Sequence, residues 1–393
     1  MVGAEPYGPY HRPPLSKAFL LGKAPLDSLE IRSDAYFREN NISLVTGEAI
    51  QDVNLQQQSA LGASGNSYPF DKLVLATGVA PIRLRVPGKN LPGVMYLGSL
   101  DDAIALKSRL DSTDRLVIVG GGYIGLELAA SARMLGKTVT VLEATDRLLK
   151  RVAPPAIGEF FLSVHRKRGV DVRLGATLTR MLGTTRGVTG VELADGVLLD
   201  ADTVVIGIGS RPSSELAQRM GLSLLPSSAI QVDEFMQTSD PRVLAVGDCV
   251  AAPDPAGRHS LIQIPSIQNA LSQARAAAAT IIGKPEAPKS IPWFWSDQYD
   301  IKLQIAGHGV AHDDVVVRGD PDSERFAVFS YCGDTLGSAA VVNRPADFLQ
   351  VRKGIEMKLA IDKNLIADDS TSLALLFKAH LNAGHPGQAA ITI

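Results

Sequence analysis

The sequence predicts an α/β protein with two domains of the Rossmann type and a smaller α+β domain at the C-terminus. Two observations support this prediction: a strand–turn pattern that occurs twice, and a glycine-rich turn between strand and helix ahead of the second copy. A third is the change to alternating strand patterns beyond residue 290. The 393 residues are enough for two or three domains, each with its own core.

The repeated pattern is an acidic residue, a β-branched run, a glycine turn and a proline. It occurs at Asp71–Pro81 and again at Asp202–Pro212, an offset of 131 residues. Such a run is typical of a buried parallel strand that stops in a tight turn. Two copies predict two similar domains.

The second copy follows a complete dinucleotide-binding unit. In its glycine motif, Gly120 permits a tight turn, Gly122 lets the backbone approach a pyrophosphate, and Gly125 lets helix and strand pack closely. The helix N-terminus then offers free N–H groups to that pyrophosphate. A G-x-G-x-x-G motif by itself is weak evidence for dinucleotide binding. Here it is flanked, in order, by a strand at 115–119, a helix at 126–135 and a strand at 138–142.

The second strand of this unit ends at Glu143, 18 residues beyond Gly125. A carboxylate at this position accepts hydrogen bonds from ribose hydroxyls and repels a 2′-phosphate, so NADH is favoured over NADPH. Arg147 leaves the alternative open, because it lies within reach of a phosphate. The predicted NAD contacts are Gly120, Gly122, Tyr123, Ile124, Gly125, Glu143 and Gly209.

The first domain has the end of this pattern without its beginning. Collinear copies would place its glycine motif ahead of residue 1, and no G-x-G-x-x-G occurs in residues 1–71. A strand, glycine turn, helix and return strand need about 30 residues. We therefore expect an N-terminally truncated domain in which residues 1–3 end the return strand. Glu5 is then either the counterpart of Glu143 or an exposed terminal residue.

The remaining elements follow from periodicity. Helical spacing predicts helices at 101–110, 152–168 and 267–282. Strands with turns, such as the one at Asp195-Gly196, are predicted at 170–186 and 191–199, a strand and turn at 230–238, and a strand at 243–248. After a linker at 283–290, strand patterns at 302–306, 315–317, 326–331 and 337–342 precede C-terminal helices. The predicted domains are residues 1–100 with 230–285, residues 101–229, and residues 291–393.

Composition excludes several classes of protein. The net charge of −2 gives no reason to expect nucleic acid, and no run of about 18 apolar residues predicts a membrane span. The only cysteines, Cys249 and Cys332, form no Cys-x-x-Cys pair, and both are expected to be buried, inert packing. The histidines are scattered, so we expect no metal site. We expect a cytoplasmic protein that is a monomer or weak dimer.

Five local sequences resemble one family. They resemble the FAD-dependent NADH:ferredoxin reductases of the putidaredoxin and rhodocoxin reductase type, which serve bacterial oxygenases. These segments are Arg12–Lys17, Leu73–Gly78, Gly120–Glu127, Val246–Cys249 and Pro292–Gln298. The resemblance runs through essentially the whole chain and implies an FAD domain, an NADH domain inserted into it and a C-terminal α+β domain. The missing N-terminal glycine motif departs from the family pattern and puts FAD binding in doubt.

The resemblance also implies roles for single residues. Lys17 lies beside the flavin N5 edge and pairs with Glu127; otherwise Glu127 only complements a helix dipole in the first turn. Asp248 hydrogen-bonds the FAD ribityl chain or, in the alternative, forms a turn or caps a helix. The other implied flavin contacts are Thr77 and Gly78, Gln268 at a helix N-terminus, and Trp293 and Trp295, which are core residues in the alternative reading.

These features predict a flavoenzyme that takes hydride from NADH onto FAD and passes single electrons to a [2Fe–2S] ferredoxin. Because a redox cysteine pair is absent from the sequence, the electrons are expected to leave the flavin directly. The alternatives are a truncated fragment without FAD or activity, and a redox signalling protein like apoptosis-inducing factor.

Overall fold

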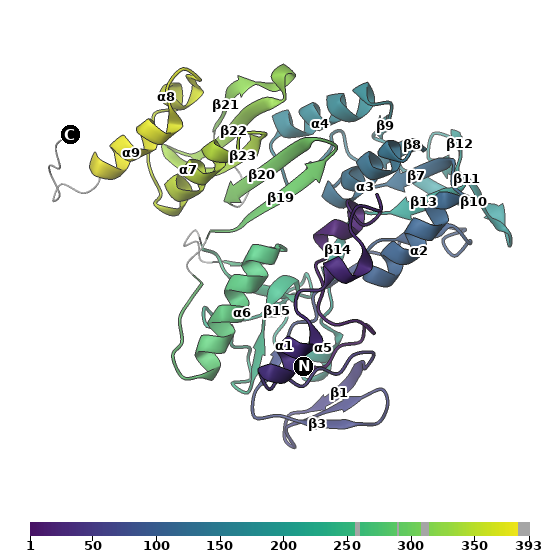
Figure 1. Ribbon diagram of the computed structural model, residues 1–393, viewed down its shortest axis with the longest axis vertical. Coiled ribbons are helices and arrows are strands. Elements are labelled where there is room, and N and C mark those ends of the chain that lie inside the picture. Colours follow the sequence, from purple (N-terminus) through teal and green to yellow (C-terminus); the bar gives the residue numbers. More distant parts are fainter. Residues whose placement is uncertain (256–259, 289–290, 308–313, 384–393) are drawn as a thin grey trace. The chain divides into compact units, whose positions relative to one another are not determined.

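The computed structural model describes residues 1–255, 260–288, 291–307 and 314–383, which group into two compact units (Figure 1). The first unit contains residues 1–116, 180–190 and 200–289, and the second contains residues 117–179, 191–199 and 290–393. Among the described residues, no helix is long and apolar enough to cross a membrane. These two units are defined by contacts within the chain and do not correspond one to one to the three predicted domains. The predicted domain boundaries therefore stay a prediction.

The first unit holds several small sheets. β1 to β3 form an antiparallel sheet, whereas β4 and β16 form a separate parallel pair. A second parallel contact is the isolated bridge between Val2 and Val45. The bounds are η1 Pro13–Ser16, η2 Leu26–Leu29, α1 Asp34–Glu39, β1 Ile50–Asn54, β2 Ser59–Gly62, β3 Ser67–Pro69, β4 Leu73–Leu75, β5 Val79–Pro81, β6 Val94–Tyr96 and α2 Leu100–Asp111.

The later strands of the first unit surround a core built around β16. Residues of β15, β16 and α6 bury apolar side chains here, among them Ile230, Val243 and Ala276.

A capping box between Ser99 and Asp102 begins α2, ahead of the later elements of this unit. The bounds are β13 Thr203–Ile206, β14 Ser210–Pro212, α5 Glu215–Arg219, β15 Ile230–Gln231, β16 Val243–Ala245, η3 Gly247–Cys249, β17 Val250–Pro253, β18 Leu261–Ile262 and α6 Ile267–Ile281.

The two copies of the repeat lie side by side. β5 of the first copy pairs antiparallel with β14 of the second, and Ala80 faces Arg211, its own repeat equivalent. The flanking bonds are symmetric as well: Ser213 N donates to Gly78 O at 2.9 Å, and Ile82 N donates to Gly209 O at 3.0 Å. The internal repeat read from the sequence is therefore a local pseudo-twofold relation between the two turns.

The second unit contains the glycine turn and the C-terminal sheet. β7 passes from the first unit into the second, and β8 pairs in parallel with β9. The bounds are β7 Arg115–Val119, α3 Tyr123–Met134, β8 Thr138–Glu143, α4 Pro155–Lys167, β9 Asp171–Leu174, β19 Trp293–Gln298, β20 Ile301–Gly307, β21 Asp314–Asp320, η4 Pro321–Ser323, β22 Arg325–Cys332, β23 Thr335–Val342, α7 Pro345–Glu356, α8 Lys363–Ala367 and α9 Leu373–Ala383. β10 Leu178–Thr184, β11 Gly187–Leu193 and β12 Leu198–Asp200 have residues in both units.

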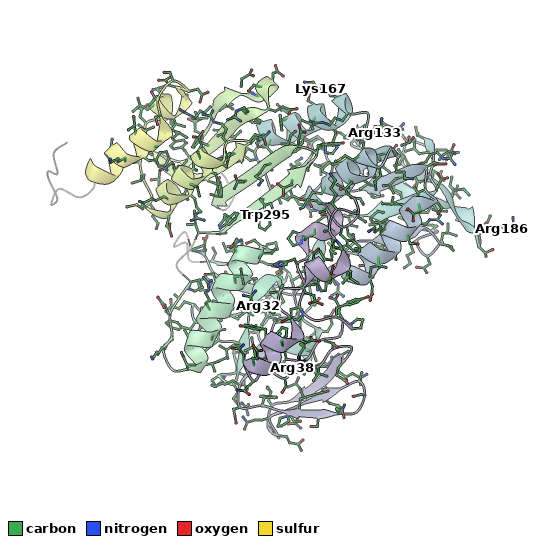
Figure 2. The ribbon with its side chains drawn as sticks, viewed as in Figure 1. Arg32, Arg38, Arg133, Lys167, Arg186 and Trp295 are labelled. Carbon is green, nitrogen blue, oxygen red and sulfur yellow. The ribbon has the colours of Figure 1, made fainter. Side chains whose placement is uncertain are left out.

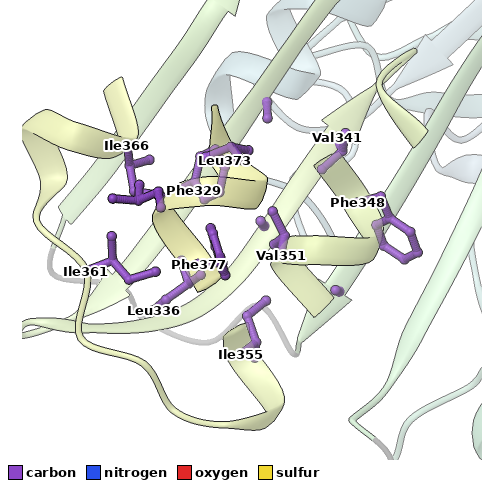
Figure 3. Close-up of a cluster of buried hydrophobic side chains, with 14 of the residues drawn as sticks. Phe329, Leu336, Val341, Phe348, Val351, Ile355, Ile361, Ile366, Leu373 and Phe377 are labelled. Carbon is purple, nitrogen blue, oxygen red and sulfur yellow. The ribbon is translucent and has the colours of Figure 1, made fainter. Parts of the chain in front are cut away.

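The C-terminal sheet is antiparallel with strand order β19-β20-β23-β22-β21, and it is covered on both faces. On one face, Phe329, Phe348, Val351 and Phe377 belong to a core beneath α7 and α9 (Figure 3). On the other, Phe326 meets Phe160 of α4, with ring centroids 5.0 Å apart. Alternate residues of a strand point to opposite faces, so this double cover explains why β22 is buried almost throughout.

Most predicted elements are confirmed, including the α/β class, the helices at α2, α4 and α6, and the four C-terminal strands. The strands with turns predicted at 170–186 and 191–199 are confirmed as well: β9 and β10 divide the first stretch, and in the second β11 ends and β12 begins around a turn at 194–196. The sequence did not predict β19, where Trp293 and Trp295 were interpreted as flavin contacts or core residues. One expectation, the burial of Cys332, is wrong. Cys332 is exposed at the end of β22, because the strand stops there.

Candidate active site

The glycine turn of the second unit has the geometry of a dinucleotide site. Gly120 has a φ of +116°, and a Cβ at Gly125 would lie 2.1 Å from Gly120 O, so these two positions require glycine. A Cβ at Gly122 would meet nothing within 4 Å, which leaves open space beside the backbone. The loop therefore has room where a pyrophosphate would lie and tight packing where the helix meets the strand.

The N-terminus of α3 is open to an anion. Gly122 is the N-cap, has no side-chain cap hydrogen bond, and is followed by a first turn without acidic residues. The positive end of the helix is thus neither capped nor neutralised by its own side chains. Tyr123 and Ile124 begin the helix, and the Ile124 side chain is 53% exposed. The predicted NAD contacts from Gly120 to Gly125 form one continuous turn.

Glu143 ties the glycine turn to the end of β8. Its Oε2 accepts a hydrogen bond from Gly121 N at 2.8 Å, and its Oε1 accepts from Thr145 N and Thr145 Oγ1, both at 2.8 Å. The acid thus lies beside the turn that would hold a pyrophosphate, where a ribose would extend. Arg147 instead donates to Ala153 O and Lys150 O, which occupies the guanidinium that could have met a 2′-phosphate.

Glu127 is buried on α3 beyond its first turn. Its side chain is 5% exposed, and Ser296 Oγ of β19 donates to its Oε1 at 2.7 Å. The simpler reading of Glu127 as a complement to the helix dipole in the first turn is therefore wrong, because that turn contains no acid. Burial, and then the negative charge of Glu127, raise the pKa of Tyr123 well above its usual value.

The first unit brings Asp248 to the N-terminus of α6. The backbone N–H of Ser266, the N-cap of α6, hydrogen-bonds the Asp248 carboxyl group. Burial raises the pKa of Asp248, whereas the Arg12 guanidinium and this hydrogen bond lower it. Gln268 lies in the first turn of α6, as predicted. A carboxylate and a helix N-terminus adjoining one another suit a ligand with both hydroxyl and electron-rich carbonyl groups.

Thr77, Gly78 and Gly209 lie at the pseudo-twofold turns. Gly78 has a φ of +64° and open space around the place of a Cβ, and Thr77 Oγ1 donates to Ser213 O at 2.6 Å. Gly209 has a φ of +114° and accepts from Ile82 N. Asp248 follows on η3, after Gly247 with a φ of +82°. The predicted FAD contacts of the first unit therefore come from strand ends, where cofactors of α/β folds bind.

Trp293 and Trp295 share one face of β19. Their ring centroids are 5.7 Å apart, and Trp293 also packs against Phe348 of α7. Trp293 is thus partly a core residue, as the alternative reading held, and both indoles remain half-buried. Lys17 ends η1 in the first unit. The pairing of Lys17 with Glu127 stays a prediction, as do the flavin contacts.

The second unit has a glycine turn that leads into the open N-terminus of α3. The first unit has a site at strand ends, where the Asp248 carboxyl group lies beside the N-terminus of α6. Together these define the class of enzyme that handles nicotinamide and flavin dinucleotides. A family model described as pyridine nucleotide-disulphide oxidoreductase matches residues 1–279, and one described as reductase C-terminal matches residues 293–377. The chain belongs to the pyridine nucleotide-disulphide oxidoreductase family and is an oxidoreductase.

Two curated relatives and one solved structure show which reductases of this family the chain is similar to. The chain is 39% identical to rhodocoxin reductase of Rhodococcus erythropolis, over 97% of this chain and 88% of the relative. It is 39% identical to putidaredoxin reductase of Pseudomonas putida, over 96% and 90%. The crystal structure of the covalent putidaredoxin reductase–putidaredoxin complex matches with a TM-score of 0.92 and 39% identity, covering 97% of this chain and 92% of that one. These relatives confirm the resemblance to FAD-dependent ferredoxin reductases.

Proposed function

We propose that this protein takes a hydride from NADH onto FAD and delivers the electrons one at a time to a [2Fe–2S] ferredoxin that serves an oxygenase. The observation that carries the proposal is the open glycine turn at α3 in a chain with a strand-end site at Asp248 and a reductase C-terminal domain. FAD, when bound, supplies the step from two electrons to one. Rhodocoxin reductase and putidaredoxin reductase are named for such small redox partners.

The residues of this chain then have distinct tasks. The backbone from Gly120 to Gly125 would hold the NADH pyrophosphate, and Glu143 would accept hydrogen bonds from the ribose. Asp248 and the first turn of α6, with Gln268, would orient FAD in the first unit. Glu127 would hold Lys17 at the reacting edge of the flavin, where a fixed positive charge favours the reduced cofactor.

The cysteines support direct electron transfer. Cys249 is buried, and its Sγ donates to Val246 O at 3.3 Å, the arrangement of a packing residue. The sequence holds only one other cysteine, Cys332, and no Cys-x-x-Cys pair. The electrons would therefore leave the flavin without passing through a disulfide. A reduced thiol at each position also suits the cytoplasm, which we propose as the compartment.

The test compares acceptors under anaerobic conditions. With FAD and NADH, the protein is expected to reduce a one-electron acceptor, either putidaredoxin or ferricyanide, and to leave oxidised glutathione unchanged. Cys249→Ala is the control and should keep the activity, because its thiol lies outside the electron path. If the wild type reduced oxidised glutathione and Cys249→Ala did not, direct electron transfer from the flavin would be overturned. If the protein oxidised NADH with none of these acceptors, the reductase function would be overturned.

We also propose that the FAD domain is completed by a strand, glycine turn and helix that pair beside β4. β4 pairs with β16 and leaves Val74 40% exposed, while Val2 and Val45 form a separate parallel bridge. A cavity of about 1200 Å³ borders α1, with Phe37 and Leu44 in its lining. One further strand would join the two parallel pairs, and its helix would cover apolar surface.

A fusion tests this second proposal. The N-terminal strand–turn–helix of rhodocoxin reductase, about 30 residues, would be joined ahead of this chain. The fusion is expected to bind FAD more tightly than the chain alone, as measured by flavin fluorescence. Equal FAD affinity of the two proteins would contradict the proposal, and a fusion with its glycines replaced by valine serves as control.

A further inference from the structure

A chain of buried polar side chains leads away from Glu127 within the second unit. Ser296, Gln298 and His165 are all fully buried in the second unit. Phe294, Ser296 and Gln298 alternate along β19 and so point to the same face of the strand, toward α3 and α4. Phe294 confirms this direction, because its ring lies 4.9 Å from that of Tyr123 on α3.

The distances connect these side chains in series. Ser296 Oγ lies 2.7 Å from Glu127 Oε1, and Gln298 Nε2 lies 3.2 Å from Ser296 Oγ. Gln298 Oε1 lies 2.9 Å from His165 Nε2. At the outer end, Tyr299 OH lies 3.4 Å from His165 Nδ1. Buried polar groups carry a cost unless they are paired, so this series is a built feature and not a surface accident.

The polarity of the series follows from its inner end. A carboxylate only accepts, so the single Ser296 hydroxyl proton points to Glu127. The Ser296 oxygen must then accept from the Gln298 amide, which turns the Gln298 carbonyl toward His165. His165 must therefore donate from Nε2 and keep Nδ1 as an acceptor facing Tyr299. Every donor in the series points toward Glu127.

The environment of His165 agrees with a neutral ring. Burial lowers the pKa of His165 to about 4, which more than offsets the raising effect of the Gln298 hydrogen bond; the Arg168 charge lowers it further. The imidazole therefore carries one proton at neutral pH, and a choice between two tautomers exists.

The outer end of the series is strained. Tyr299 occupies the two-residue turn between β19 and β20 with a φ of +58°, a conformation that favours glycine or asparagine. Its ring lies 5.3 Å from that of His165 and beneath the Arg168 guanidinium at 4.6 Å. A tyrosine at this turn costs conformational energy, and its contacts with His165 and Arg168 are the interactions that oppose this cost.

We propose that Ser296, Gln298 and His165 are positioning residues that fix the Glu127 carboxylate, through a one-directional hydrogen-bond series, for its part in the hydride step. The proposal rests on the proposed function in one respect, the role of Glu127 toward Lys17. The direction of the series itself depends only on contacts within the second unit.

The direction is tested by ¹⁵N NMR of the His165 imidazole in the protein without added cofactor. The wild type is expected to show the Nε2–H tautomer. In Glu127→Gln the new amide can donate to Ser296, the series can reverse, and the Nδ1–H tautomer is expected to appear. An Nδ1–H tautomer in the wild type would overturn the proposal, and its appearance in Glu127→Gln would support it.

The positioning role is tested by anaerobic stopped-flow reduction of the bound flavin by NADH. Ser296→Ala is expected to lower the rate of hydride transfer about tenfold, because small displacements of reacting groups are costly. Its dissociation constant for NADH should stay within about a factor of two of the wild-type value. Ser296→Thr keeps the hydroxyl group and is expected to recover most of the rate.

The matched control is Ser330→Ala. Ser330 is also fully buried in the second unit, but its Oγ lacks a hydrogen-bond partner among the described residues. Equal rates in Ser296→Ala and Ser330→Ala would overturn the positioning role while leaving the reductase function intact. A wild-type flavin that NADH does not reduce would instead refute the proposed function, and the NMR result would still stand by itself.

Discussion

The two copies of the repeat have the same local sequence pattern and very different surroundings. Val205, at the centre of β13 in the second copy, is 2% exposed, whereas its equivalent Val74 in β4 is 40% exposed. All four residues of β13 are buried, and one residue of β4 is. A β-branched run ending in a glycine turn therefore specifies a strand and its turn, but neighbouring strands decide whether that strand is a core strand.

The same contrast separates the two cofactor regions. The NAD region has its own strand, glycine turn, helix and acid, and the acid, Glu143, accepts a hydrogen bond from Gly121 of the turn. The candidate FAD residues of the first unit follow strand ends or lie on α6, and β4 beside them has one paired edge in its sheet. The first region is therefore specified by contacts within one short segment, and the second by strand ends and a helix from distant parts of the chain.

The largest expected effect is at the glycine turn. Gly125→Ala places a Cβ 2.1 Å from Gly120 O, so the helix must move away from the strand. We expect a loss of about 3 kcal/mol in the free energy of unfolding, together with loss of NADH binding. Urea denaturation and NADH titration measure the two effects.

Gly122→Ala is the matched control for this change. Its Cβ would meet nothing within 4 Å in the protein, so stability should be retained while NADH binding weakens. Equal destabilisation by both substitutions would show that the open space at Gly122 is wrongly assigned.

The second prediction tests the repeat directly. Val205→Ala is expected to lower the free energy of unfolding by about 2 kcal/mol, because it removes buried methyl groups. Val74→Ala at the equivalent position should cost less than about 0.5 kcal/mol. In the fusion that supplies a strand beside β4, the cost of Val74→Ala should rise toward that of Val205→Ala. Equal costs in the chain alone would break the comparison.

A third prediction concerns the pH dependence of the free energy of unfolding, through His165 in the second unit. The pKa of His165 is about 4 in the folded protein and near its usual value of 6.5 after unfolding, so the unfolded chain binds more protons between these values. Stability should therefore fall as the pH drops from about 6.5 to about 4, by an amount on the order of 2 kcal/mol. His165→Gln is expected to remove this part of the slope. Urea unfolding of both proteins at pH 7 and pH 4.5 checks it, and parallel slopes would contradict it.

The smallest expected effect is at Glu143. Glu143→Ala removes the acceptor beside the glycine turn and is expected to raise the dissociation constant for NADH about tenfold, or about 1.4 kcal/mol. Discrimination against NADPH should also decrease, because the repelling charge is gone. Titration with both nucleotides measures this, and unchanged discrimination would remove Glu143 from the specificity argument.

The sequence predicts the NAD region well because its signals are local. Strand, Gly120, Gly122, Gly125, helix and acid all lie within one short segment, and each residue type has a steric or electrostatic reason. The repeat was equally readable, although the pairing of Ala80 with Arg211 was not, since it joins residues 131 positions apart.

Other features depend on contacts that local patterns do not encode. Glu127 is buried and accepts a hydrogen bond from Ser296, which lies far along the chain on β19. The sequence did not predict that strand, because Trp293 and Trp295 were interpreted one by one, as flavin contacts or core residues, and not as parts of a strand. Alternation of Phe294, Ser296 and Gln298 along the same stretch was the signal that could have revealed it.

The most direct test of the central claim is the visible absorbance spectrum of the FAD-reconstituted protein under anaerobic conditions, before and after NADH is added. Flavin bands that bleach on addition of NADH are the predicted result, because the proposed function transfers a hydride from NADH onto FAD. A protein that binds no flavin at saturating FAD, or whose flavin bands persist with excess NADH, would contradict the account.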